Sequence, residues 1–351
     1  MSAVKTTNTA KNTTTNSATG RRKGPQLTAN GQPRHKRPSA RGKVAALLTP
    51  ALLLIGVIIL YPLLSGVVLS FKSDPVLNRH DGFFYPGGFI GFRNYGYWLT
   101  QSCSTGSSTV ACPSGTLAND FWPALGNTLF FTLVTVLLET IIGIGIALVM
   151  AQNFRGRGLL RAAVLVPWAI PTAITAKLWS FLFAEQGIIN SLFHTTIAWQ
   201  TDPWAARFSI ILADVWKTTP FMALLILAGL QMIPKDLYEA ARVDGANAWQ
   251  RFTRITLPLA KGSIVVAVLF RMLDALRMYD LPYIMVGPNP DSPTATVSQL
   301  VVAAIRQDQV NVASALSTLI FLLIFLIALF FVKVLGARLN KQPDPVVAEE
   351  D

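Results

Sequence analysis

The sequence has 351 residues, of which 52% are hydrophobic and only 14% are charged. Soluble proteins average about 25% charged residues, so this composition indicates an integral membrane protein and argues against a soluble chain. The formal net charge is +12 at pH 7, but residues 1–43 hold ten Lys and Arg and no acid, leaving +2 for the rest. The basic character therefore belongs to a tail and does not indicate a nucleic-acid-binding domain.

The sequence also argues against metal and nucleotide sites. Cys103 and Cys112 are the only cysteines and there are three histidines, whereas a structural zinc site usually takes four such ligands. No Gly-x4-Gly-Lys-Ser/Thr sequence occurs, so the chain has no P-loop. We expect no metal and no cofactor on this chain, and any ATP and Mg²⁺ chemistry belongs to a partner.

Six apolar runs are long enough to cross a membrane, since a helix needs about 20 apolar residues to span roughly 30 Å of hydrocarbon. The first run is too long for a signal-peptide core and begins more than forty residues into the chain, so we interpret it as an uncleaved span. The prediction is an all-α integral membrane protein with a six-helix domain over 44–336. Its spans lie near 44–71, 124–151, 159–184, 207–230, 262–286 and 313–336.

The distribution of Lys and Arg predicts the orientation, because short loops rich in these residues stay in the cytoplasm. Three arginines follow span two and five basic residues follow span four, whereas 285–312 holds only Arg306. Both termini are therefore predicted to be cytoplasmic, including a C-terminal tail over 337–351.

This orientation places 72–123 outside the cell as a long loop. Cys103 and Cys112 lie in it, and an even number of cysteines in an oxidising compartment favours a structural disulfide, with two reduced cysteines as the alternative. The tail 1–43 has almost no large apolar residue and is predicted to be disordered. The tail either attracts anionic headgroups or only fixes the topology.

Four ionisable residues interrupt the fifth span, where each costs roughly 2.5–3.5 kcal/mol unless it faces protein or water. Arg271, Asp274, Arg277 and Asp280 lie three residues apart and alternate in sign, so neighbours are predicted to pair along one side of a helix. Their depth suits a translocation pathway. Ion pairs that only hold helices together are the alternative.

The third and fourth spans also contain residues that favour contact with protein or water over contact with lipid. Asp214 and Lys217 lie three residues apart in the fourth span, and Pro220 is expected to kink or interrupt that helix. Pro167 and Pro171 interrupt the third span, and irregular backbone at membrane depth is tolerated only where it is buried in protein or lines water. Spans three to five are predicted to form the wet part of the protein.

The loop 231–261 between spans four and five has strong local signals. Pro234 and early acidic residues favour a helix from about 235 to 244, and Gly245 favours its end. Asn247 is a good cap for a second helix. We therefore predict a compact cytoplasmic helix-turn-helix.

The first of these helices presents small apolar residues on a charged surface, which lets a partner approach closely; a simple connector is the alternative. The spacing of its motif resembles, without departure, the coupling loop of permease subunits in binding-protein-dependent ABC importers. The motif is Glu239-Ala240-Ala241, three residues, Gly245, nine residues, Ile255, one residue, Leu257-Pro258.

Further strings are similar to the sugar-permease branch of that family, and the resemblance covers most of 44–336. They are Phe92-Arg93-Asn94-Tyr95, Ala124-Leu125-Gly126-Asn127-Thr128-Leu129, Val166-Pro167-Trp168-Ala169-Ile170-Pro171, Leu182-Phe183 ahead of Gly187-Ile188-Ile189-Asn190, and Leu273-Asp274-Ala275-Leu276-Arg277-Met278-Tyr279-Asp280.

The resemblance implies a transport subunit, not an enzyme, in the bacterial cell membrane. It implies a second permease subunit, two ATP-binding subunits that use ATP and Mg²⁺, and an extracytoplasmic sugar-binding lipoprotein. Glu239 is then the charged anchor of the docking helix, Gly245 its turn, and Leu257-Pro258 the return into the membrane.

The fifth-span strings are most similar to actinobacterial permeases for trehalose or a related disaccharide, with glycerol phosphate or another oligosaccharide as alternatives. Trp216 is the aromatic residue we favour for stacking on a sugar, although packing and interfacial roles are commoner. A membrane-embedded enzyme lacks an acid/base or metal cluster in this sequence. A channel would have no use for the docking motif.

Overall fold

The computed structural model describes residues 40–77, 82–105 and 108–339. These residues fall into two units that divide between Leu60 and Tyr61. The first unit contains α1 (Ala40–Ile55) and a π-helical turn (Gly56–Leu60). Most of the predicted disordered tail lies outside the described residues, but its last four residues already belong to α1.

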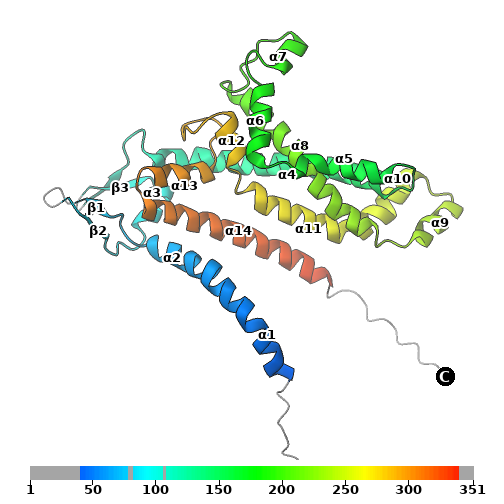
Figure 1. Ribbon diagram of the computed structural model, residues 1–351, viewed down its shortest axis with the longest axis horizontal. Coiled ribbons are helices and arrows are strands. Elements are labelled where there is room, and N and C mark those ends of the chain that lie inside the picture. Colours follow the sequence, from blue (N-terminus) through cyan, green and yellow to red (C-terminus); the bar gives the residue numbers. More distant parts are fainter. Residues whose placement is uncertain (1–39, 78–81, 106–107, 340–351) are drawn as a thin grey trace, which may run out of the picture. The chain divides into compact units, whose positions relative to one another are not determined.

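The second unit is mainly helical and includes two small hairpins (Figure 1). Its elements in chain order are α2 (Tyr61–Leu69), β1 (Val76–Leu77), β2 (Phe84–Tyr85), α3 (Arg93–Leu99), β3 (Ser102–Thr105), β4 (Ser108–Ala111), α4 (Phe121–Ala151), α5 (Arg157–Ala169), α6 (Thr172–Leu182), α7 (Ile188–Phe193), α8 (Pro203–Leu230), α9 (Lys235–Val243), α10 (Ala248–Arg251), α11 (Leu257–Ala275), α12 (Asp280–Met285), α13 (Val297–Arg306) and α14 (Val310–Leu339).

Five helical segments of the described chain are long and apolar enough to cross a membrane: Leu47–Leu69, Leu117–Ala151, Pro203–Leu230, Ala248–Ala275 and Val310–Lys333. The pair α5 and α6 makes a sixth if it counts as one span, with a bend of 89° at the break. Figure 1 shows α6 and α7 projecting away from the direction of α5. The described residues therefore contain five or six candidate spans against the six predicted, and the third predicted span is broken near Pro171.

The second unit is built around α4, α8 and α11, and small residues let these helices approach closely. A Cβ atom added at Gly143 of α4 would lie 3.1 Å from the Cβ of Met222 on α8. One added at Gly229 of α8 would lie 2.0 Å from Oγ of Ser263 on α11. Lipid tails are as apolar as the side chains of these helices, so the hydrophobic effect does not drive helices together within a membrane. Helices associate there by close packing, which small residues allow.

Two predictions about helix continuity are wrong. The fifth span does not run from 262 to 286, because α11 ends at Ala275 and α12 begins only at Asp280. The fourth span is not interrupted at Pro220, since α8 continues through it. Thr218 and Thr219 donate their hydroxyls to carbonyls four residues earlier, and α8 is packed against α4 and α11, so tertiary contacts outweigh the effect of one proline.

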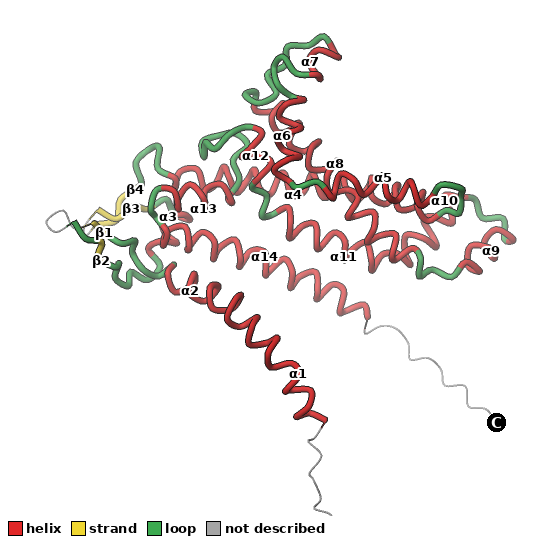
Figure 2. The backbone as a smooth tube through the Cα atoms, in the orientation of Figure 1, coloured by secondary structure: helices red, strands yellow, loops and turns green. Residues whose placement is uncertain are grey.

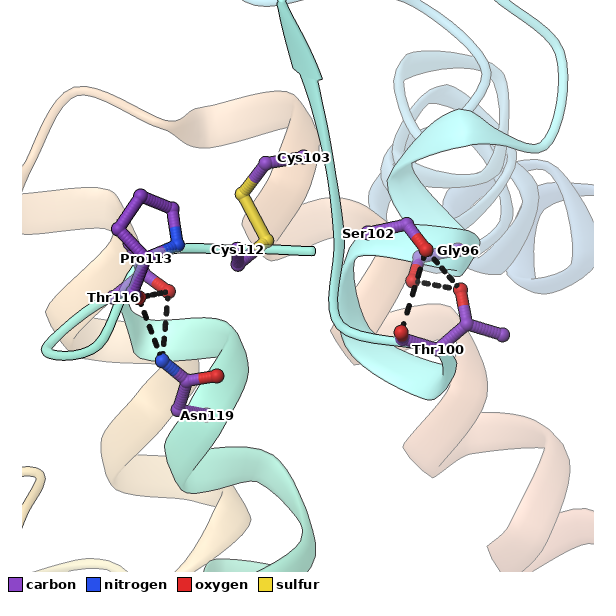
Figure 3. Close-up of a disulfide and its surroundings, with 8 residues drawn as sticks. All are labelled: Gly96, Thr100, Ser102, Cys103, Cys112, Pro113, Thr116 and Asn119. Atoms are coloured by element: carbon purple, nitrogen blue, oxygen red, sulfur yellow. Dashed lines mark hydrogen bonds between the residues drawn. A yellow bond between two sulfur atoms is a disulfide. The ribbon is translucent and has the colours of Figure 1, made fainter. Parts of the chain in front are cut away.

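The expected all-α fold is also not complete, because the predicted outer loop contains two antiparallel hairpins, β1–β2 and β3–β4. Figure 2 shows these strands at the end of the second unit opposite to α9 and α10. A disulfide joins Cys103 on β3 to Cys112 after β4, and Figure 3 shows it between two groups of local hydrogen bonds. Thr100 and Ser102 bond each other on one side, and Asn119 donates to the carbonyl of Pro113 on the other.

This hairpin region is tied to the start of α14. The indole N–H of Trp98, a fully buried side chain on α3, donates to the carbonyl of Val312 at 2.9 Å. The backbone N–H of Asn311 donates to the carboxylate of Asp74 at 2.5 Å. The first N–H groups of a helix have no partner within the helix, so Asp74 caps α14 from another part of the chain.

Candidate functional site

Three carboxylates surround one arginine at the contact of α4, α8 and α11. Nε of Arg271 on α11 lies 2.5 Å from Oε2 of Glu139 on α4. Its Nη2 donates to Asp214 on α8, and its Nη1 lies 3.1 Å from Oδ2 of Asp274 one turn further along α11. The guanidinium therefore uses its whole fork of donors to connect three helices.

Most of this network is buried, so its charges cost free energy unless each is paired and hydrogen-bonded. The side chains of Arg271 and Glu139 are 2% and 0% exposed, whereas that of Asp274 is 66% exposed. A buried charge is tolerated only when it is paired and its remaining atoms are hydrogen-bonded. Thr218 meets part of this need by donating its hydroxyl to Oε1 of Glu139 at 2.6 Å.

A cavity of about 140 Å³ lies beside the network, between α6, α8, α11 and α12. Charged and hydroxyl-bearing side chains dominate its lining. They are Thr172, Asp214, Lys217, Thr218, Arg271, Asp274, Arg277, Tyr279 and Asp280, together with Met278 and Leu281.

Most of the predicted pathway residues line this cavity. Those of the fifth span do not lie along one continuous helix as predicted, because that span is broken between α11 and α12. Of the expected row of pairs along the fifth span only the Arg271–Asp274 pair forms, because the helix ends before Arg277. Nε of Arg277 donates instead to the carbonyl of Leu273, and within the described chain neither Arg277 nor Asp280 forms an ion pair.

Trp216 is the exception, since it does not line this cavity. Its ring lies edge-on to Trp179, with 5.8 Å between the ring centroids. Tyr279 is the aromatic residue at the cavity, stacked on Tyr283 at 4.9 Å. The contacts of Trp216 therefore favour a packing role over stacking on a sugar.

Glu139 and Thr218 were not predicted from the sequence as members of this site. The signal for Glu139 was present, because it is a single carboxylate within the apolar run of the second span and the rule applied to the fifth span holds there equally. No local signal marks Thr218, whose partner lies 79 residues away.

The loop 231–261 folds as expected from its local signals. The helix α9 (Lys235–Val243) ends before Gly245, which has a φ of +77°, a conformation that favours glycine. Asn247 and Gln250 form a reciprocal capping box at the start of α10. A π-helical turn containing Ile255 then leads to Leu257 and Pro258, the first residues of α11.

The helix α9 has two different faces. Lys235, Tyr238, Glu239 and Arg242 line a cavity of about 830 Å³, and the Tyr238 hydroxyl lies 3.0 Å from Oγ1 of Thr256. The opposite face carries Leu237, Ala240, Ala241 and Asp244, and Leu237 is 45% exposed. Glu239 is thus on the cavity face, but its side chain is exposed and available to a partner.

In the described ranges no group of three or more His, Cys, Asp or Glu side chains has the arrangement to hold a metal ion. The polar cavity has both signs of charge and several hydroxyls, an arrangement that is suited to binding a polar solute.

Long apolar helices, a broken span and a polar cavity at helix contacts are typical of a multi-pass membrane protein that moves a polar solute. Residues 139–341 match the family described as the inner membrane component of binding-protein-dependent transport systems. The chain belongs to this family: it is a transport subunit and not an enzyme.

Relatives with assigned names extend the match. MalF, a trehalose/maltose transport system permease protein from Thermococcus litoralis, is 39% identical over 292 residues, covering 80% of this chain and 93% of the relative. SugA, a trehalose transport system permease protein from Mycobacterium tuberculosis, is 36% identical over 293 residues, which cover 83% of this chain and 88% of SugA. SmoG, a sulfoquinovosyl glycerol transport system permease protein from Agrobacterium fabrum, is 36% identical and covers 83% and 90%.

Solved structures support the same fold. A chain of a bacterial ABC transporter that imports the acidic polysaccharide alginate matches with a TM-score of 0.67 and 22% identity, covering 85% of this chain and 96% of the other. A chain of the alginate transporter in complex with its pentasaccharide-bound periplasmic protein matches with a TM-score of 0.68 and 23% identity, covering 86% and 96%.

Proposed function

We propose that this permease carries trehalose or a related disaccharide into the cell. The observation that supports this most directly is the cavity beside Arg271, where carboxylates, a tyrosine ring and hydroxyls stand together within the helical bundle. Such groups bind sugar hydroxyls and the apolar face of a sugar ring. The names of two relatives, at 39% and 36% identity, point to the same class of solute.

The cavity in this chain forms only part of the sugar site. Its volume of about 140 Å³ is below the roughly 300–1,000 Å³ of most ligand pockets. A second permease subunit facing this cavity supplies the remaining wall. Asp214, Asp274 and Asp280 accept hydroxyl hydrogens in this proposal, and Lys217, Arg271 and Arg277 donate to sugar oxygens.

The topology follows from the charge bias and from the arrangement of the loops. The hairpin region and α9 lie at opposite ends of the second unit (Figure 2). With the basic loops in the cytoplasm, both termini and the loop 231–261 are inside. The loop 72–123 is then outside, where an extracytoplasmic sugar-binding lipoprotein delivers the solute.

The loop 231–261 couples transport to two ATP-binding subunits, which use ATP and Mg²⁺. The outer face with Ala240 and the half-exposed Ala241 docks against the ATPase, and Glu239, whose exposed side chain lies on the cavity face of α9, supplies a charged contact at the edge of that interface. Gly245 sets the turn after α9. Ile255, Leu257 and Pro258 return the chain to the membrane. Closure of the ATP-binding subunits then moves the bundle between two discrete states.

The proposal is tested by ATPase activity of the reconstituted complex with its own binding protein loaded with different solutes. We expect trehalose to stimulate hydrolysis several-fold and maltose to stimulate it less. Stimulation by neither sugar, in a complex that still hydrolyses ATP, would overturn the disaccharide assignment.

Glycerol phosphate is a second candidate. Lys217 and Arg277 line the cavity without an ion-pair partner in the described chain, and two free cations suit a phosphate group. Stimulation by glycerol phosphate in the same assay, with trehalose inactive, would favour this candidate.

A further inference from the structure

A second cavity, at the end of the unit that carries α9, is strongly basic. Its volume is about 830 Å³, and it lies between the end of α4, the start of α5, the end of α8, and α9 and α10. Five of its lining residues are cationic: Arg157, Arg161, Lys235, Arg242 and Arg251. Glu239 is the one acidic residue in the lining.

The cations of this cavity are not neutralised within the described chain, where all three ion pairs belong to Arg271. Arg161 is held in place by one hydrogen bond, from Nη2 to the carbonyl of Met150 at the end of α4, at 2.7 Å. Its Nε is buried and has no hydrogen-bond partner. A buried donor without a partner in the protein is costly, so Nε favours a ligand that brings an acceptor atom to it.

The neighbouring arginines are held in a similar way. Nη1 of Arg157 donates to the side-chain oxygen of Asn153 at 2.5 Å, and Nη1 of Arg251 donates to the carbonyl of Ala246 at 3.2 Å. In each case one nitrogen is used by the protein and the others remain for a ligand. An anchored guanidinium loses less rotational freedom when it binds an anion.

We propose that this cavity binds a phosphate-bearing anion. Arginine forks match the oxygens of a phosphate group in geometry as well as charge. A volume of about 830 Å³ lies within the range of most ligand pockets, so the anion carries a sizeable group beyond the phosphate. Basic pockets between helices at the cytoplasmic surface accept lipid headgroups, and a soluble sugar phosphate has the same chemistry.

The site has a mechanical consequence, which rests on the proposed coupling role of α9. Lys235 and Arg242 come from α9, whereas Arg157 and Arg161 come from α5. A bound anion would hold the inner face of α9 against α5 while its outer face docks against the ATPase. It would therefore regulate coupling without occupying the sugar site.

Binding can be measured on the purified complex in nanodiscs, without sugar and without ATP, so its result is independent of the transport assignment. One arm titrates glucose 6-phosphate into nanodiscs of phosphatidylcholine. The other measures retention of phosphatidylglycerol by native mass spectrometry. We expect saturable binding in at least one arm, and the arm that responds identifies the soluble or the lipid source.

Charge-matched variants locate the site. R157Q/R242Q removes two exposed cations of the lining, and R161Q/R251Q removes two that are partly buried. Each pair should weaken binding roughly tenfold or more. The control R254Q/K261Q removes two cations of the same loop that do not line the cavity and should change binding less than twofold. No saturable binding in either arm, or an equal loss in the control, would overturn the proposal.

Discussion

Glu139 and Arg271 are 132 residues apart in the sequence, yet their side chains meet at 2.5 Å in the interior of the second unit. Asp214 completes the contact from a third helix. The three helices that carry these residues also approach one another closely at Gly143 and Gly229, so the ion network lies within a tightly packed part of the bundle. It joins the helices and forms one wall of the polar cavity proposed to bind sugar.

Replacing Arg271 by Ala should strongly destabilise the protein, because Glu139 and Asp214 would be left as buried carboxylates without a counter-charge. Breaking a buried ion pair from one side costs about 3–5 kcal/mol. The measurement is thermal unfolding of the purified protein in detergent. Arg271→Lys keeps the charge and loses the fork, so its midpoint should fall between those of wild type and Arg271→Ala. A midpoint of Arg271→Ala within about 1 °C of wild type would contradict the network.

Asp274→Ala should change stability little and transport much. Arg271 keeps Glu139 and Asp214 as partners, and the Asp274 side chain is 66% exposed, so its ion pair contributes about 1 kcal/mol at most. Its carboxylate lines the cavity, and uptake of labelled trehalose by cells expressing the variant should fall at least several-fold. Wild-type uptake at equal expression would remove Asp274 from the pathway.

Gly245→Ala should impair coupling, because φ at this position is +77° and a left-handed backbone costs a residue with a side chain roughly 1–2 kcal/mol. Gly262→Ala is the matched control, since an added Cβ meets nothing within 4 Å at either glycine and only Gly245 has a positive φ. The ratio of sugar imported to ATP hydrolysed, measured in proteoliposomes, should fall for Gly245→Ala alone. Equal ratios in both variants would show that the turn is not needed.

Ala240→Trp tests which face of α9 meets the ATPase. A large ring on the outer face should block docking while leaving the fold intact, because this residue is exposed. Co-purification of the ATP-binding subunits with the tagged permease is the readout. Met232→Trp, at a residue 84% exposed just before α9, is the control and should retain the ATPase. Loss in both, or in neither, would argue against this docking face.

Features set by local interactions could be predicted from the sequence. The apolar runs gave the spans, and Gly245 with Asn247 gave the helix-turn-helix, because a turn and a cap depend on neighbours within a few residues. The disulfide followed from the two available cysteines and the compartment assigned to their loop.

Features that depend on contacts between distant parts of the chain could not be predicted from the sequence. The alternating charges from Arg271 to Asp280 have the spacing of a continuous helix, but α11 ends at Ala275. The other partners of Arg271 lie on two different helices, α4 and α8. Pro220 was expected to kink or interrupt the fourth span, and the interruption does not occur, because α8 continues within the packed bundle. Side-chain pairing across 57 and 132 residues has no local signature.

The bonds that tie the hairpin region to α14 have a consequence for how a displacement passes along the second unit. Trp98 and Asp74 both hold the first turn of α14, one through the carbonyl of Val312 and the other through the amide of Asn311. In the proposed orientation, a displacement of the hairpin region would therefore move the last span directly. Docking of a loaded binding protein on that side would then move the 30-residue helix α14 as one rigid element.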